Sequence, residues 1–300
     1  MIKNSSLIAH SSSLSLKAPA KINWFLTILE KREDGYHDIM SFMQCIGLYD
    51  ELLFSHADTI EIVSDLDIPR EDNLVYKAAL LLRNYASYGK GVRIVLHKQI
   101  PLDAGLGGGS SNAAYTLLGL NILWALHLQK RELNSIGLEI GSDVPFFLNG
   151  PSAVVKGKGE QVTPLEITTS PFIFLLVKPP VSVSTAWAYT SYNTYRKGGL
   201  TKKLVDIKLF CETLLKRDFA SLCTMLNNDL EGIVIEKYPV VREIKEGLLQ
   251  RGAVFSAMSG SGPTVFGVFE SEDRAFAAAR EMGSYWCRVV TPVTSDEVNF

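Results

Sequence analysis

The sequence predicts an α+β protein, in which strands and helices follow one another without regular alternation. Within residues 92–97, apolar side chains recur at every second position, which is typical of a half-buried strand. Residues 74–82 place apolar side chains at helical spacing, directly after an Asp72-Asn73 pair that is typical of a helix N-cap. The chain has no short-period repeat, so a solenoid is not expected.

Length and composition indicate a folded protein of two lobes. The chain has 300 residues, of which 47% are hydrophobic and 21% charged, so it can form a sizeable core. The formal net charge is −2, without the basic excess that neutralises phosphates, and this disfavours nucleic acid as a partner. The composition changes around residues 150–164, and we place the lobe boundary there. The prediction is a lobe of residues 1–164 and a lobe of residues 165–300.

Cysteine and histidine spacing excludes several kinds of site. The four cysteines form no CxxC pair, and the five histidines form no HExxH or HxH group. A zinc site and a disulfide framework are therefore not expected. A reducing compartment is the expected location.

Apolar stretches in the chain are strand-sized, well short of the roughly 18 residues that span a bilayer. Residues 1–13 are rich in serine and lack the pattern of a secretory signal, so we expect a frayed extension before the first strand. No membrane partner and a cytoplasmic location are the resulting predictions.

The remaining elements follow from local patterns in chain order. Residues 14–29 alternate well enough for one or two strands broken at Pro19, and Glu33-Asp34-Gly35 is typical of a turn. Further strands are predicted over residues 172–177 and 264–269. Further helices are predicted from Pro239 to a stop at Gly252 and over residues 275–282.

The clearest chemical signal is a glycine-rich loop, residues 105–111, which reads Gly-Leu-Gly-Gly-Gly-Ser-Ser. It follows the strand at 92–97 and precedes a predicted helix over residues 112–126. Glycines let a backbone approach an anion closely, and a helix N-terminus favours phosphate. The loop lacks the lysine of a Walker A motif, and the chain has no HRD or DFG sequence. Phosphate binding is favoured over a plain flexible turn.

Four other segments carry candidate residues whose roles stay open on local grounds. Lys21 and Asn23 lie in an early Pro-Ala-Lys-Ile-Asn segment and are by themselves ordinary strand residues. Asp143 precedes a Val-Pro-Phe-Phe run, where a carboxylate either caps a turn or acts as a catalytic base. The Asp-Gly-Tyr-His turn at 34–37 and the small-residue loop at 258–263 are as easily packing features as functional ones.

Taken together and in order, residues 19–23, 105–111 and 259–262 resemble three motifs of the galactokinase, homoserine kinase, mevalonate kinase and phosphomevalonate kinase (GHMP) superfamily. Residues 32–37 and 141–147 narrow the resemblance to the branch that serves the non-mevalonate isoprenoid pathway. Residues 157–160, 178–182 and 228–231 extend the match, which covers nearly the whole chain from Leu16 onward.

The resemblance implies a two-lobed small-molecule kinase with its active site in the cleft between the lobes. ATP would be the co-substrate, magnesium would accompany it, and the acceptor would be the 2-hydroxyl of a cytidine-diphosphate-linked methylerythritol. The rivals are another kinase of the superfamily, and a sensor that keeps the fold without catalysis.

The resemblance also implies roles for single residues. Asp143 would orient the acceptor hydroxyl and receive its proton, and Lys21 would stabilise developing negative charge. Asn23 would contact the methylerythritol portion. The cytosine would stack on Tyr36, next to hydrogen bonds from the region of His37. A second ring would complete the stack, with Tyr189 favoured over Trp187.

Two loops complete the implied site. The ATP-binding residues would be Pro101, Leu102, Asp103, Ala104, Gly105, Leu106, Gly107, Gly108, Gly109, Ser110 and Ser111. The late glycine loop would contribute Ser259, Gly260, Ser261 and Gly262. Ser111 is the one magnesium ligand that this resemblance assigns.

Overall fold

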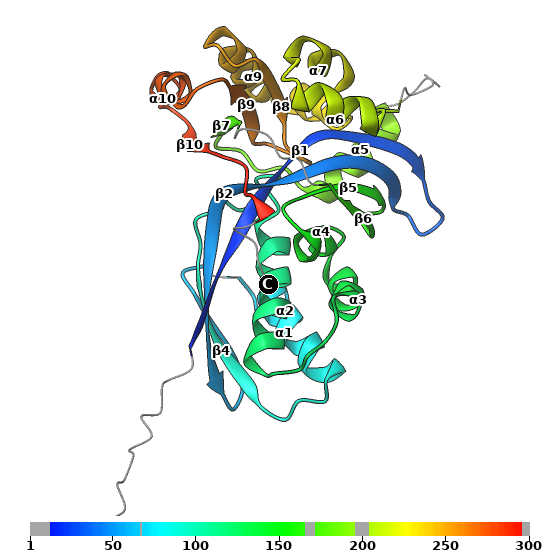
Figure 1. Ribbon diagram of the computed structural model, residues 1–300, viewed down its shortest axis with the longest axis vertical. Coiled ribbons are helices and arrows are strands. Elements are labelled where there is room, and N and C mark those ends of the chain that lie inside the picture. Colours follow the sequence, from blue (N-terminus) through cyan, green and yellow to red (C-terminus); the bar gives the residue numbers. More distant parts are fainter. Residues whose placement is uncertain (1–12, 67, 166–171, 196–203, 296–300) are drawn as a thin grey trace, which may run out of the picture.

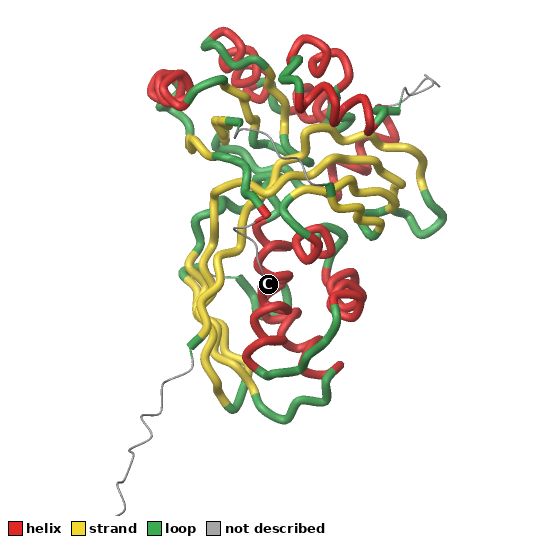
Figure 2. Tube along the Cα trace, in the orientation of Figure 1, coloured by secondary structure: helices red, strands yellow, loops and turns green. Residues whose placement is uncertain are grey.

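The structure is a computed structural model that describes residues 13–66, 68–165, 172–195 and 204–295. Two sheets, each with helices packed against it, form two lobes that meet near the middle of the chain trace (Figures 1 and 2). This is the α+β, two-lobed arrangement that the sequence predicts. The predicted extension falls almost entirely outside the described residues.

The first lobe is built on a six-stranded sheet in the order β3-β4-β2-β5-β6, with β1 paired to β2. Its strands are β1 (Leu14–Lys31), β2 (His37–Ala57), β3 (Ile60–Ser64), β4 (Gly91–His97), β5 (Ser152–Gly157) and β6 (Gln161–Pro164). Figure 1 shows its helices gathered on one side of the sheet. They are α1 (Leu74–Tyr85), α2 (Gly108–Leu123), α3 (Lys130–Ile140) and α4 (Val144–Asn149).

The second lobe is built on an antiparallel sheet in the order β10-β7-β9-β8. Its strands are β7 (Ile173–Lys178), β8 (Phe255–Met258), β9 (Val265–Phe269) and β10 (Trp286–Val290). Its helices are α5 (Thr185–Tyr195), α6 (Ile207–Leu215), α7 (Phe219–Met225), α8 (Glu231–Lys237), α9 (Val240–Gln250) and α10 (Glu272–Glu281). The lobe boundary predicted at residue 164 coincides with the end of β6, and its exact position remains a prediction.

Strand β1 runs through Pro19 instead of stopping there. The register against β2 shifts between Pro19 and Ala20, which marks a bulge. Because β2 is the one strand of the sheet that pairs with β1 in the described chain, β1 lies at an edge, where a missing N–H is tolerated. The turn that follows is the predicted one, with Gly35 at φ +86°.

Helix α2 begins at Gly108, four residues earlier than predicted, and ends at Leu123 instead of residue 126. Gly107, at φ +71°, is its N-cap, so the glycines and serines that follow form the first helical turn. The prediction was wrong because glycine has low helix propensity, which the packing of the buried Gly108 and Ser111 overrides. A Cβ on Gly108 would lie 2.9 Å from the Ile100 side chain, so glycine is what lets the turn pack so closely.

The other predicted elements occur within three residues of their predicted bounds. Helix α1 is capped by Asn73, whose side chain accepts hydrogen bonds from two backbone N–H groups of the first turn. Gly252 follows α9 at φ +89°, which suits a helix stop. Helix α10 begins at Glu272, earlier than predicted, because Ser271 caps it.

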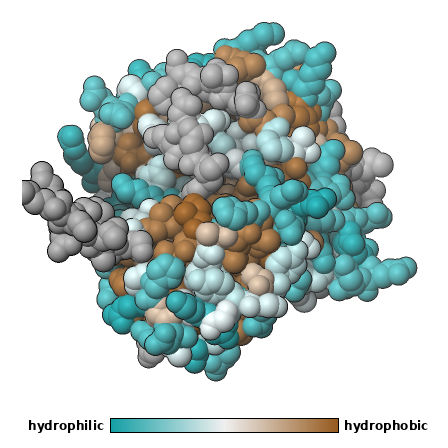
Figure 3. Space-filling view, turned by 60° about the horizontal axis from the view of Figure 1, so that its bottom comes forward, coloured by the Kyte–Doolittle hydropathy of each residue, from teal (hydrophilic) through white to brown (hydrophobic). Residues whose placement is uncertain are grey.

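The two lobes share a hydrophobic core. Trp24 of β1 is 1% exposed and packs edge-on against Phe174 and Phe266 of the second sheet, with ring centroids 5.6 and 6.2 Å apart. Strand β1 therefore belongs structurally to both lobes. On the outer surface, hydrophobic side chains gather toward the middle of the face in Figure 3, with hydrophilic ones around them.

No helix in the described part of the chain is long and apolar enough to cross a membrane.

Candidate active site

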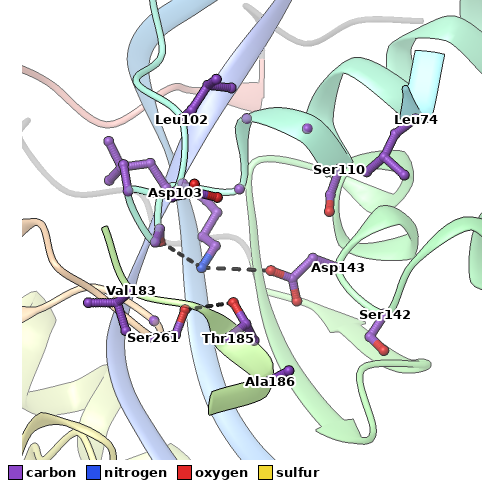
Figure 4. A pocket seen from close by; sticks show the side chains of 18 of the residues that line it. Leu74, Leu102, Asp103, Ser110, Ser142, Asp143, Val183, Thr185, Ala186 and Ser261 are labelled. Carbon is purple, nitrogen blue, oxygen red and sulfur yellow. Dashed lines mark hydrogen bonds and ion pairs between the residues drawn. The ribbon is translucent and has the colours of Figure 1, made fainter. Parts of the chain in front are cut away.

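A cavity of about 980 Å³ lies between the lobes, and most of the predicted site residues line it. We call one part of it the glycine end. That end is lined by residues 101–110 together with Leu66, Ile68, Leu74, Val75 and Leu96. We call the other part the aromatic end, which is lined by Tyr36, His37, Lys158 and Tyr189. Figure 4 shows Asp143 pointing into the space between Ser110 of the glycine loop and Thr185 of α5.

Lys21 lies between the two ends, on β1. Its Nζ donates to Asn23 Oδ1 at 2.6 Å and to the carbonyl of Gly105 at 3.0 Å, and lies 3.7 Å from Asp143 Oδ2. The lysine is 3% exposed. Burial lowers the pKa of Lys21, and the charge of Asp143 opposes that shift only in part. A buried ammonium beside a carboxylate can stabilise charge that develops on a transferred phosphoryl group.

Asp143 occupies the N-cap position of α4, but its side chain makes no capping hydrogen bond. Its side chain is 32% exposed, whereas the Val-Pro-Phe-Phe run that follows it is buried. The carboxylate is thus directed at Lys21 and the cavity, not at the helix end. This geometry favours the catalytic interpretation of Asp143 over the capping one.

The glycine loop approaches both the late glycine loop and Lys21 closely. A Cβ on Gly105 would collide with the carbonyl oxygen of Ser259, and Gly105 has φ +73°. A Cβ on Gly107 would lie 3.0 Å from Lys21 Cγ. The first N–H groups of α2 have no carbonyl partner within the helix, as at any helix start, and this turn lines the cavity. The arrangement suits an anion such as a phosphate.

Ser111 does not fit its predicted role as a metal ligand. Its side chain is fully buried, its hydroxyl has no hydrogen-bond partner, and it is absent from the cavity lining. Ser110 lies one position earlier on the helix, about 100° around it, and does line the cavity. Among the residues that the structure describes, no group of three or more His, Cys, Asp or Glu could hold a metal ion.

At the aromatic end, His37 stacks on Tyr189 with ring centroids 5.5 Å apart and planes 29° apart. Tyr36 is 55% exposed, and Lys158 Nζ lies 5.0 Å from the centre of its ring. Burial raises the pKa of Tyr189, and the charge of Asp143 raises it further. An exposed ring next to a stacked pair leaves a surface for a flat ligand.

Trp187, the competing candidate for the second ring, lies elsewhere. It packs against Tyr238, and Lys237 Nζ lies 4.0 Å from the centre of its ring. It is absent from the residues that line the cavity. Of these two candidate rings, Tyr189 is therefore the one that faces the site.

The late glycine loop reaches the cavity with two of its four predicted residues, Gly260 and Ser261. Ser261 Oγ is 2.8 Å from Thr185 Oγ1 at the start of α5. Ser259 instead donates to the carbonyl of Gly105 at 3.0 Å, and Gly262 is buried next to Met258. The loop is thus partly a lining and partly a packing element.

The sequence analysis missed a buried carboxylate that supports the glycine end. Asp50 is 0% exposed, pairs with Lys98, and accepts hydrogen bonds from Asn112 Nδ2 at 2.9 Å and from the backbone N–H groups of Gln99 and Ile100 at 2.7 and 2.9 Å. It therefore fixes the chain just before the glycine loop. Its neighbours in the sequence are Tyr49 and Glu51, so no local signal indicates that this carboxylate is buried.

The apolar wall of the glycine end was missed as well. It comes from the segment between β3 and α1, from the start of α1, and from β4. Leu74 and Leu96 appear in the sequence as ordinary helix and strand residues, so no local signal separates them from core residues.

The fold and this site together define a small-molecule kinase of the GHMP type. The family model described as "GHMP kinases N terminal domain" matches residues 73–151, and the one described as "GHMP kinases C terminal" matches residues 209–287. A solved homoserine kinase from Cytophaga hutchinsonii, 20% identical, shares the fold with a TM-score of 0.73 over 98% of this chain and 99% of that one.

Within this superfamily, the chain belongs to the 4-diphosphocytidyl-2-C-methyl-D-erythritol kinases. A relative of that name from Thermodesulfovibrio yellowstonii is 48% identical over 92% of this chain and 97% of its own length. Another from Caldanaerobacter subterraneus subsp. tengcongensis is 40% identical over 95% of this chain and 98% of its own length. A crystal structure of 4-(cytidine 5'-diphospho)-2C-methyl-D-erythritol kinase, 32% identical, has a TM-score of 0.80 and covers 93% of this chain and 99% of that one. These matches confirm the predicted resemblance.

Proposed function

We propose that this protein transfers the γ-phosphoryl group of ATP to the 2-hydroxyl of 4-diphosphocytidyl-2-C-methyl-D-erythritol, a step that supplies isoprenoid precursors. The observation that carries the proposal is the single cavity in which the Lys21–Asp143 pair lies between a glycine end and an aromatic end. Relatives at 40–48% identity over nearly their whole length bear the corresponding name. The reaction takes place in the cytoplasm, without a nucleic-acid or membrane partner.

In this proposal the acceptor hydroxyl lies beside Asp143. The Asp143 carboxylate receives its proton as the acceptor oxygen forms a bond to the γ-phosphorus, and the bond from that phosphorus to the β–γ bridging oxygen breaks to release ADP. The Lys21 ammonium stabilises the charge on the transferred group from its buried position. Asn23, held by Lys21 and by Ser41 Oγ at 2.8 Å, orients the methylerythritol portion.

The two ends bind the two substrates. The glycine end holds the ATP phosphates on the first turn of α2, with the adenine against the apolar wall of Leu66, Leu74 and Leu96. The aromatic end holds the cytosine between Tyr36 and the Tyr189–His37 pair. Lys158 lies close enough to Tyr36 to face the negative charge of a bound diphosphate.

Magnesium would accompany ATP, and when bound it would neutralise part of the phosphate charge. The protein atoms that fit it are the Ser110 hydroxyl and the partly exposed Asp143 carboxylate, which both line the cavity. Oxygen donors of this type suit a hard cation. Ser110 thus takes the place that the sequence analysis gave to Ser111.

The test is ADP release by the purified protein with ATP, magnesium and a panel of acceptors. The panel contains 4-diphosphocytidyl-2-C-methyl-D-erythritol, the same polyol phosphate without cytidine, homoserine and mevalonate. We expect turnover with the cytidylated compound alone. Turnover with another acceptor would reject the substrate and keep the kinase. Silence with every acceptor, from a folded protein that binds ATP, would favour a sensor.

A further inference from the structure

The Asn-Asp-Leu-Glu motif near residue 230 lies outside the cavity lining, yet it connects two elements of the site. We call residues 227–231 the brace. The brace runs beside β1, where Leu26 N donates to the carbonyl of Asn227 and Asp229 N donates to the carbonyl of Leu26, both at 2.9 Å. Ile28 N donates to Asp229 Oδ2 at 2.7 Å. The brace is therefore anchored to the strand that carries Lys21 and Asn23.

The opposite side of the brace holds the late glycine loop. Asn228 is 4% exposed, and its Nδ2 donates to the carbonyls of Met258 and Gly260, both at 2.8 Å. Its Oδ1 accepts from Leu230 N at 3.0 Å, so each side-chain heteroatom of Asn228 has a partner. Glu231 accepts from Met258 N at 2.8 Å and pairs with Lys245. Two side chains thus fix the backbone of the late loop where β8 ends.

The segment that Asn228 fixes lies directly against the catalytic lysine. A Cβ on Gly260 would lie 3.0 Å from Lys21 Nζ and 3.2 Å from Asn23 Oδ1. Ser259 Oγ shares with Lys21 Nζ the carbonyl of Gly105, each at 3.0 Å. A shift of a few tenths of an ångström in this loop would therefore displace the ammonium or one of its acceptors.

We propose that Asn228 is a positioning residue for phosphoryl transfer, which acts through the Gly260 backbone to hold the Lys21 ammonium in place. The inference rests on the proposed role of Lys21. A buried amide that satisfies two carbonyls at once cannot be replaced by a group of the same shape that lacks the two donors. Such a replacement should displace Lys21 more than it disturbs the two substrate-binding ends.

The main variant is Asn228→Asp, which keeps the shape and the acceptor for Leu230 N but removes the paired donors. We expect kcat to fall by about 10- to 100-fold, because small displacements of catalytic groups have effects of this size, while KM for ATP and for the acceptor stays within about threefold. Asn228→Ser, which retains one donor, is the milder variant if Asn228→Asp does not fold, with an expected fall in kcat of about fivefold or more.

Two controls separate positioning from general loss of stability. Val241→Ala creates a cavity in the core of the same lobe, at a residue that is fully buried in α9, and should lower the melting temperature without changing kcat. Glu236→Gln changes an exposed residue of α8 and should change neither quantity. If Val241→Ala, at equal loss of melting temperature, lowers kcat as much as Asn228→Asp does, the brace is merely structural and the inference is overturned.

A double-mutant cycle with Lys21 gives the sharpest test. In the Lys21→Met background the lysine is already gone, so Asn228→Asp should lower the residual kcat by no more than about twofold. An equal factor in both backgrounds would show that Asn228 does not act through Lys21. The unsubstituted protein is assayed in parallel with the same acceptor, so its turnover tests the proposed function and the ratio of variant to unsubstituted kcat tests the brace.

Discussion

The glycine end and the aromatic end of the cavity are built from different chemical groups. The glycine end is mostly backbone and aliphatic surface, fixed by close contacts such as the one between Gly105 and Ser259. The aromatic end is made of side chains, including an exposed ring at Tyr36 and a stacked His37–Tyr189 pair. A backbone-built end provides a shape that suits a triphosphate in general. A side-chain-built end can be altered one residue at a time, so we expect the choice of acceptor to reside there.

The largest expected effect lies between the ends, at Asp143, the proposed proton acceptor. Asp143→Asn keeps the shape but removes the proton acceptor, so kcat should fall by about 10³-fold or more, with KM for the acceptor little changed. Steady-state kinetics with the cytidylated acceptor measure this. Glu139→Gln, on the exposed face of α3, is the matched control. Residual activity within tenfold of the unsubstituted protein would make Asp143 a turn residue.

A smaller effect should be confined to the glycine end. Gly107→Ala forces an alanine to φ +71° and places its Cβ 3.0 Å from Lys21 Cγ and Phe147 Cζ. We expect kcat/KM for ATP to fall by about 100-fold, with KM for the acceptor little changed. In Gly109→Ala the new Cβ meets only Leu74 Cδ1, at 3.3 Å, and the expected loss is about threefold. Equal losses in the two variants would show that this loop does not depend on backbone approach.

At the aromatic end, a substitution should change KM for the acceptor and leave KM for ATP unchanged. Tyr36→Ala removes a stacking surface worth on the order of 1–3 kcal/mol, so KM for the acceptor should rise by about tenfold or more. The values of kcat and of KM for ATP should stay near those of the unsubstituted protein, and Tyr36→Phe should behave normally. An unchanged KM for the acceptor in Tyr36→Ala would remove this ring from the cytidine site.

The smallest expected effect is on the stability of the fold. It concerns the buried charge of Lys21, which lies between the ends. Burial lowers the pKa of Lys21 in the folded state, so the unfolded chain binds this proton more tightly. The folded state is therefore penalised below the unfolded pKa of about 10.4, and the penalty disappears above it. Lys21→Met should raise the melting temperature by on the order of a few degrees at pH 7, and the gain should shrink toward pH 10.4. A lower melting temperature for Lys21→Met at pH 7 would mean that its polar contacts outweigh burial.

How far the sequence predicts this site depends on which end is considered. Gly105, Gly107 and Gly108 are informative one by one, because a Cβ on each would meet another atom at 3.0 Å or less, and the first two also have positive φ angles. Leu74 and Leu96 carry no such information, since an aliphatic residue that lines a cavity and one in a core look alike in the sequence. The sequence allows two roles for Asp143, because its side-chain direction, not its neighbours in sequence, decides between them.

Several strands and helices were not predicted, and for two features of the fold the physical reason is clear. Strand β2 was not predicted, because the first half of it is buried on both faces and shows no alternation. The start of α2 was placed too late because packing overrode the low helix propensity of glycine. The resemblance assigned Ser111 as a magnesium ligand, whereas Ser110 lines the cavity, because the helical phase decides which serine faces it.

Strand β1 has a consequence for how the molecule folds and unfolds. It pairs with the first sheet along its length, while its Trp24 packs among the phenylalanines of the second lobe. A chain cut near residue 164 would leave the indole on one fragment and its aromatic partners on the other. The lobes cannot behave as independent folding units, and either half expressed alone would expose the large apolar face that it normally shares. Probes placed in the two lobes should therefore report one cooperative unfolding transition with a common midpoint.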